Sequence, residues 1–134
     1  MGTRSVTKIY RQDADEEPKL VMALYKQFDG YPEGWGKSLK EFFKTGTFVN
    51  GLSSKNKGLL FNGAGDFALL LVKEFKTESG DLYATVEDDE QEVNYKITFI
   101  TDKEWEPLKV IFECLEEKKY NEVFKVIKDG KRTN

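Results

Sequence analysis

Two segments near the beginning of the chain have the hydrophobic pattern of β-strands. Residues 5–11, SVTKIYR, are rich in β-branched and aromatic residues, and residues 19–28, KLVMALYKQF, are apolar at positions that face both sides of a sheet. The stretch between them, residues 12–18, is polar and acidic. This arrangement predicts a β-hairpin whose second strand is central in its sheet.

Three later segments also have strand character. Residues 81–88 and 92–100 flank an acidic stretch, residues 87–90, and we expect them to form a second hairpin with a solvated tip. In the later of these two strands apolar and polar side chains alternate, which indicates one buried face. Residues 107–115, PLKVIFECL, predict a fifth strand.

Two helices are predicted in the middle of the chain. Ser38 and Glu41 have the spacing of a capping box, so a short helix should begin at Ser38 and end at Gly46. A strongly apolar helix is expected over residues 66–76, with Asp66 as its N-cap. The residues of this helix that should lie in the core are Phe67, Leu70, Leu71 and Phe75.

The remaining segments complete the fold prediction. Residues 47–65 are rich in Gly, Ser and Asn and should be irregular, with at most a short extended piece. Residues 118–130 predict an amphipathic helix, because apolar residues recur there with helical spacing. Those residues are Tyr120, Val123, Phe124 and Ile127.

The order of these elements is ββ-α-α-βββ-α, without a regular alternation of strands and helices. It predicts an α+β fold: a mostly antiparallel sheet of about five strands, with about three helices packed mainly on one face. The length of 134 residues suggests one domain over residues 1–134, with residues 129–134 as a frayed tail.

Composition excludes several functional classes. The net charge is −3 and the isoelectric point about 5.2, so a nucleic-acid partner is not expected. The chain has no histidine, which excludes Ser-His-Asp and Cys-His catalysis and histidine-ligated metals. Its one cysteine, Cys114, lies in an apolar run and should be a buried, inert thiol. No signal peptide or transmembrane run is evident, so we expect a cytoplasmic protein without a membrane partner.

The stretch DGYPEGWG, residues 29–36, is the strongest candidate for a binding loop. It places two aromatic residues, Tyr31 and Trp35, among Gly and Pro residues that make the chain turn. Two interpretations remain open. The aromatic rings are exposed anchors for a partner, or they fold back and cover an edge of the sheet.

The stretch GAGDFA, residues 63–68, fits the glycine pattern of dinucleotide-binding turns. Its context does not fit, because only a short apolar run precedes the glycines and the required βαβ units are missing. Gly63 and Gly65 leave two alternatives: a turn packed beneath the following helix, or backbone N–H groups that hold an anion at the helix start.

Several separated motifs resemble one family. The matching positions are Met1 to Ser5, Tyr25, Gln27 to Pro32, Gly34, Gly36, Leu39, Phe42, Asn62, Gly63, Gly65, Phe75, Gly80 and Tyr83. The chain is similar over roughly residues 1–86 to small uncharacterised proteins of bacteria, phages and large DNA viruses that open with MGTRS and carry Q-[FY]-D-G-Y-P-x-G-x-G. Relatives often have a histidine near Phe75, which is absent here. The resemblance implies an accessory protein, associated with phages or mobile elements, that counteracts host defence.

Together these observations predict a small non-enzymatic binding protein. Its partner would be a host or phage protein, or a small anionic metabolite such as a nucleotide signal; its oligomeric state stays open. We expect no cofactor, no bound metal and no catalytic residues. The residues expected to contact the partner are Arg4, Asp29, Gly30, Tyr31, Pro32, Gly34, Trp35, Gly36, Asn62, Gly63 and Gly65.

Two alternatives to this function remain. The first is a Mg²⁺-dependent nucleotide hydrolase in which Asp29, Glu33 and Asp66 hold the metal ion. The second is a structural subunit that associates with itself through Tyr31 and Trp35. Magnesium-dependent turnover separates the first alternative from a binding protein, and the state of association separates the second.

Overall fold

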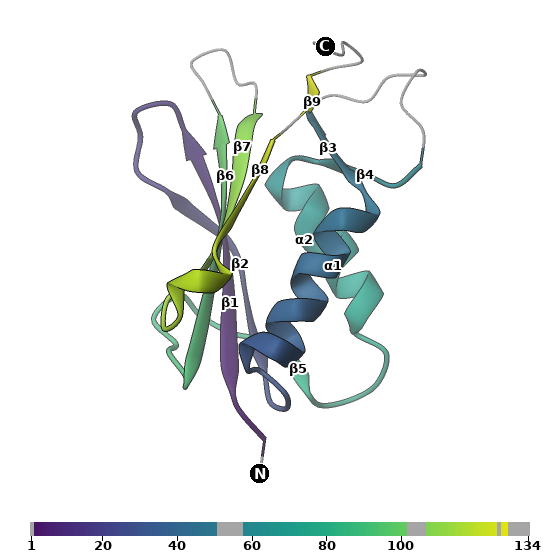
Figure 1. The fold of residues 1–134 in the computed structure, drawn as a ribbon, viewed down its shortest axis with the longest axis vertical. Coiled ribbons are helices and arrows are strands. Elements are labelled where there is room, and N and C mark those ends of the chain that lie inside the picture. The colour runs from purple at the N-terminus through teal and green to yellow at the C-terminus, as the bar shows by residue number, and fades with distance from the viewer. Residues whose placement is uncertain (1, 51–57, 102–106, 126, 129–134) are drawn as a thin grey trace.

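A computed structural model describes residues 2–50, 58–101, 107–125 and 127–128. Within them the chain forms a mixed six-stranded sheet with two α-helices on one face, and a smaller three-stranded sheet beyond the helix ends (Figure 1). The order in the main sheet is β5-β2-β1-β6-β7-β8. Its strands are β1 (Ser5–Asp13), β2 (Lys19–Lys26), β5 (Leu82–Ala84), β6 (Val93–Thr101), β7 (Pro107–Cys114) and β8 (Glu122–Lys125). The α+β class is therefore confirmed.

The first predicted hairpin is present and the second is wrong. Strands β1 and β2 pair antiparallel, with a bulge after Ile9. Strand β5 pairs with β2 at the edge of the sheet, whereas β6 pairs with β1 in parallel, so the sheet is mixed. The acidic stretch between β5 and β6 is thus a crossover past β2 and β1, and partial burial together with the nearby Glu87 carboxylate raises the pKa of Tyr10. Strand β7, which the sequence predicted without a partner, pairs antiparallel with β6.

The predicted C-terminal helix is also wrong. A short 3₁₀ turn, Lys118–Tyr120, leads into β8, which pairs with the free edge of β7. Phe124 packs on the core, while its neighbour Val123 is 55% exposed, as the period of a strand requires. The chain then contributes β9 (Ile127–Lys128) to the smaller sheet. The predicted tail, residues 129–134, lies outside the described residues.

The start of the first α-helix and its capping differ from the prediction. A π-helical turn, Pro32–Gly36, runs directly into α1 (Lys37–Thr45). Ser38 therefore lies inside the helix, no side chain caps its start, and the predicted capping box does not form. Gly46 ends the helix as predicted.

The segment before the second helix is more regular than expected. Strands β3 (Thr47–Asn50) and β4 (Leu60–Asn62) pair in parallel and form the smaller sheet with β9. Helix α2 (Gly63–Phe75) begins three residues earlier than the sequence suggested. Asp66 does not lie at the N-cap, but its carboxylate accepts the backbone N–H of Asn62 at 2.8 Å.

Phenylalanine rings form most of the core between the sheet and the helices. Every phenylalanine except Phe28 is buried or partly buried there. Phe67 is central: its ring contacts those of Phe42, Phe43, Phe48, Phe61 and Phe99. Cys114 is buried in the same core, which confirms its predicted burial, and burial raises the pKa of its thiol. Neither described helix is long and apolar enough to cross a membrane.

Candidate functional site

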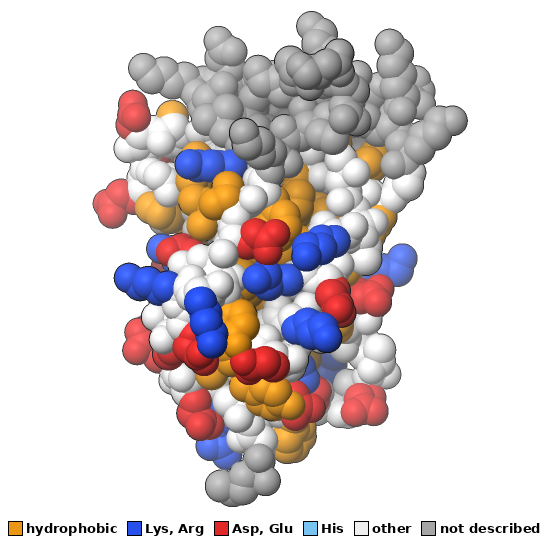
Figure 2. Space-filling model, viewed as in Figure 1, with side chains coloured by type: hydrophobic (Ala, Val, Ile, Leu, Met, Phe, Trp, Pro, Cys, Tyr) orange, Lys and Arg blue, Asp and Glu red, His pale blue; other side chains and the backbone are white. Residues whose placement is uncertain are grey.

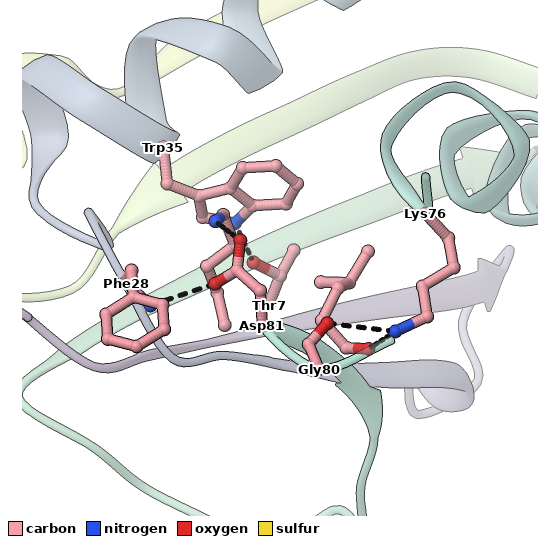
Figure 3. Close-up of polar contacts among 8 residues, drawn as sticks. Thr7, Phe28, Trp35, Lys76, Gly80 and Asp81 are labelled. Carbon is pink, nitrogen blue, oxygen red and sulfur yellow. Dashed lines mark hydrogen bonds and ion pairs between the residues drawn. The ribbon is translucent and has the colours of Figure 1, made fainter. Parts of the chain in front are cut away.

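The two aromatic residues of the loop have different environments. Trp35 is 2% exposed, and its indole N–H donates to the Thr7 hydroxyl at 2.9 Å (Figure 3). Its ring packs edge-on against Phe75. Trp35 therefore belongs to the core, and the interpretation of this residue as an exposed anchor is wrong. Tyr31 is 41% exposed, and Phe28 just before it is 50% exposed.

The glycines of the loop allow the chain to pack against itself. A Cβ on Gly30 would lie 2.6 Å from the Ser5 side chain, and one on Gly34 would lie 2.7 Å from the Asp29 carbonyl oxygen. Gly36 faces the Tyr95 hydroxyl, and Pro32 is buried at the start of the π-helical turn. Gly30, Pro32 and Gly36 are buried and shape the loop from beneath, whereas Gly34 also lines the cleft described below.

Asp29 begins the loop in a left-handed conformation, with φ of +59°. Asp and Asn adopt this conformation more readily than other residues with a side chain. It lets the Asp29 carbonyl oxygen accept the Trp35 backbone N–H at 2.7 Å, which closes the loop. The carboxylate of Asp29 consequently stays exposed at the surface.

Beneath the loop lies a polar layer in which one hydroxyl has no partner. Tyr95 donates its hydroxyl to the Gly30 carbonyl oxygen at 2.7 Å, and burial raises the pKa of that phenol. The Ser5 hydroxyl is buried beside Gly30 and makes no hydrogen bond within the described part of the chain.

We expect the Ser5→Ala variant to be as stable as the parent protein or more stable by up to about 1 kcal/mol, because a buried hydroxyl without a partner costs free energy. Chemical denaturation followed by circular dichroism measures this. The contrasting variant is Thr7→Val, which removes the acceptor of the Trp35 indole and should lower the unfolding free energy by about 1–3 kcal/mol. A loss of similar size in Ser5→Ala would show that Ser5 is hydrogen-bonded.

Asp81 fixes the junction of the loop with strands β2 and β5. Its carboxylate accepts the Lys26 ammonium at 2.5 Å and the Phe28 backbone N–H at 3.0 Å (Figure 3). Partial burial alone would raise the pKa of Asp81, but the hydrogen bonds from Lys26 and Phe28 outweigh it and lower the pKa below its ordinary value. The Lys26 ammonium also lies 5.4 Å from the centre of the Trp35 ring.

Acid should destabilise the protein partly through Asp81. Because its pKa is lower in the folded state, Asp81 contributes stability above about pH 4, and this is lost as pH falls through the folded-state pKa. We expect Asp81→Asn, which keeps a residue that tolerates the left-handed backbone, to lower the unfolding free energy by about 1 kcal/mol at pH 7. The fall in stability between about pH 5 and about pH 2 should become shallower. Asp15→Asn, at an exposed turn position, is the control; an equal change there would contradict the assignment.

Lys76 holds the outer edge of β5. Its ammonium donates to the carbonyl oxygens of Gly80 and Leu82, at 3.0 Å and 2.7 Å (Figure 3). The Leu82 N–H also donates to the Gly80 carbonyl oxygen. These bonds occupy polar groups of an edge strand that would otherwise be available to pair with another chain.

A cleft of about 500 Å³ lies between the loop, α1, the end of α2 and the junction of β2 with β5. Four carboxylates and two ammonium groups line it, together with apolar side chains. The lining residues are Lys26, Asp29, Tyr31, Glu33, Gly34, Trp35, Lys37, Ser38, Glu41, Phe75, Asp81 and Leu82. Trp35 and Phe75 form part of the wall of the cleft, and this wall is rigid because both side chains pack into the core.

A second hollow of about 400 Å³ adjoins the cleft along α1 and shares Glu33, Lys37 and Glu41 with it. Tyr120 forms its far side and donates its hydroxyl to Glu33. This hydrogen bond raises the pKa of Tyr120 to about 12 and lowers that of Glu33. Figure 2 shows basic and acidic side chains interspersed on the face of the molecule where α1 lies in Figure 1.

The structure brings together only some of the residues expected at the site. Asp29, Tyr31, Gly34 and Trp35 line the cleft, whereas Arg4 does not. The turn 62–66 does not line it either, because it begins α2 while the cleft lies at the other end of that helix. A helix of this length spans about 19 Å. No added side chain would meet a neighbour at Gly63 or Gly65, and Gly63 has a φ of +87°, a conformation that glycine adopts more readily than other residues.

The same separation applies to the alternative metal site. Asp29 and Glu33 line the cleft, but Asp66 lies in the first turn of α2. Across the described ranges, no three His, Cys, Asp or Glu side chains are close enough to share a metal ion. The three proposed Mg²⁺ ligands therefore do not converge.

Sequence reasoning missed much of the cleft. Lys37 and Glu41 lie one turn apart on the polar side of a helix that was predicted, so its amphipathic pattern could have placed them beside the loop. Lys26, Asp81 and Leu82 come from segments whose position depends on strand pairing, and Phe75 comes from the end of α2; no local signal places any of them beside the loop. We compared the chain with protein families, curated proteins and solved structures, and none of them matches it.

Proposed function

We propose that this chain is a non-enzymatic binding protein that recognises a partner protein through the cleft beside loop 29–36. The observation that carries the proposal is a concave site of about 500 Å³ with a rigid wall at Trp35 and the half-exposed Tyr31 in its lining. Preformed concave sites with a few polar groups are typical of binding surfaces. Exposed aromatic side chains beside them are the usual anchors of a partner.

A protein partner fits the cleft better than an anionic metabolite. Four carboxylates line it against two ammonium groups, and one of those, Lys26, is paired with Asp81. The resulting local potential opposes a nucleotide phosphate. The resemblance to proteins of phages and mobile elements supports a host protein as the partner, met in the cytoplasm and connected with host defence.

Site-specific photo-crosslinking tests the proposal. Tyr31 is replaced with p-benzoylphenylalanine, the protein is produced in host cells, and adducts are identified by mass spectrometry after irradiation. The matched control carries the same group at Val123, an exposed position on β8. We expect one defined protein adduct from position 31 and none from position 123.

Other outcomes would replace the proposal. An adduct of the chain with itself would favour the self-associating subunit, for which Tyr31 remains an exposed contact. Equal adducts from both positions, or none from position 31, would overturn recognition at the loop. Hydrolysis of a nucleotide with Mg²⁺ that disappears in Asp29→Asn would show an enzyme instead.

A further inference from the structure

The carboxylates of the cleft differ in whether they already have partners. Asp81 accepts Lys26, and Glu33 accepts the Tyr120 hydroxyl. Asp29 and Glu41 are exposed, and their carboxylates make no hydrogen bond or ion pair with the rest of the described chain. Two carboxylates on the lining of one cleft are therefore available to a ligand from outside.

The same cleft already holds one cation. The Lys26 ammonium lies 5.4 Å from the centre of the Trp35 ring while it contacts Asp81, so an aromatic ring and a carboxylate hold it together. Tyr31 and Asp29 provide the same two kinds of group at the exposed side of the cleft. The two kinds of group that hold Lys26 are thus repeated at the exposed side of the cleft, where the Asp29 carboxylate has no ion pair or hydrogen bond within the described residues.

Resting on the proposed function, we propose that the partner protein inserts one arginine or lysine side chain into this cleft, between the Tyr31 ring and the carboxylates of Asp29 and Glu41. Guanidinium and ammonium groups bind both carboxylates and aromatic faces. The volume of about 500 Å³ accommodates a long side chain together with ordered water.

Two surrounding features define the segment that carries this side chain. Phe28 and Tyr31 are both exposed and lie three positions apart in sequence, so apolar residues next to the cation would cover them, which a free small cation would not do. Lys37 lines the cleft, and Lys44 lies further along α1. They repel a run of basic residues lying along the helix. The inserted residue is therefore a single cation flanked by apolar residues.

The test is a titration of isotope-labelled protein with capped pentapeptides, followed by ¹⁵N–¹H NMR. The probes are Ala-Leu-Arg-Leu-Ala and the same peptide with citrulline or glutamate in the centre; citrulline keeps the shape of arginine without its charge. We expect the arginine peptide to shift the signals of cleft residues and to bind at least about fivefold more tightly than the citrulline peptide. The Asp29→Asn/Glu41→Gln variant should lose this preference, whereas Asp15→Asn/Glu17→Gln, at the β1–β2 turn, should keep it.

The possible failures are distinguishable. Equal shifts by the arginine, citrulline and glutamate peptides at the cleft would overturn the cationic contact and leave the proposed binding function intact. Equally strong shifts with free spermidine would overturn the protein segment as the source of the cation. If no peptide perturbs the cleft, the inference fails, and a missing Tyr31 adduct in the crosslinking experiment would then reject the proposed function as well.

Discussion

Replacing Trp35 with alanine is expected to lower the free energy of unfolding by about 3–5 kcal/mol, the cost of removing a large buried aromatic side chain. The ring is almost fully buried and packs against Phe75, so the variant leaves a cavity between the loop and the end of α2. It also removes the indole N–H, so the Thr7 hydroxyl loses the hydrogen bond that it accepts in the parent protein. Because a domain of ordinary stability has an unfolding free energy of only about 5–15 kcal/mol, this loss is a large share of the total.

Denaturant titration followed by circular dichroism measures this loss. The matched control is Tyr31→Ala, which removes an exposed aromatic from the same loop and should change stability by less than about 1 kcal/mol. Trp35→Phe keeps much of the packing but lacks the indole N–H. Its loss of unfolding free energy should lie between those of Tyr31→Ala and Trp35→Ala. If Trp35→Ala melted like the parent protein, the burial of Trp35 and the rigid wall of the cleft would both be wrong.

An aspartate at position 71 is expected to prevent folding altogether. Leu71 has no exposed surface in the core beneath α2, and a carboxylate buried there would have no partner. The pattern of residues 66–76 singled out Leu70 in the same way, but Leu70 is only partly buried. Leu70→Asp should therefore be less damaging than Leu71→Asp.

The comparison is made by expressing the Leu71→Asp, Leu70→Asp and Leu69→Asp variants separately. The soluble fraction and the thermal transition of each are then measured. Leu69 is 65% exposed, so its aspartate variant should be soluble and melt cooperatively. Soluble, cooperatively melting Leu71→Asp protein would contradict the orientation of α2. An insoluble Leu69→Asp protein would show that the outer side of α2 is covered.

The loop at residues 29–36 shows how far a candidate site can be read from a sequence. Its Gly, Pro and aromatic content correctly indicated a shaped turn, and Asp29, Tyr31 and Trp35 do line the cleft. The exposure of each ring could not be derived, because it depends on what lies beneath. The Trp35 side chain hydrogen-bonds Thr7 and packs against Phe75, both of which are distant in sequence. Tyr31 is less covered and stays partly exposed.

The C-terminal segment shows why local periodicity can predict the wrong element. Residues four positions apart share a face both in a helix and in a strand, so the pair Tyr120 and Phe124 fits either. Val123 discriminates between them, because it would share their face in a helix and lies on the opposite face in a strand; an exposed valine at an edge strand costs little. The unpaired edge of β7 decides the outcome, since pairing satisfies the backbone groups of both strands.

By itself the sequence determined the features that depend on neighbouring residues: the β1–β2 hairpin, strands β6 and β7, and the two central helices. Each has a continuous hydrophobic pattern bounded by turn residues. Tertiary structure alone decided that β6 lies parallel to β1 and that β5 moves to the far side of β2. A strand carries the same alternation whichever neighbour it has, so its partner is chosen by competition for backbone hydrogen bonds and core surface across the whole sheet. That competition brings Asp81 and Lys26 to the loop and thereby forms the cleft.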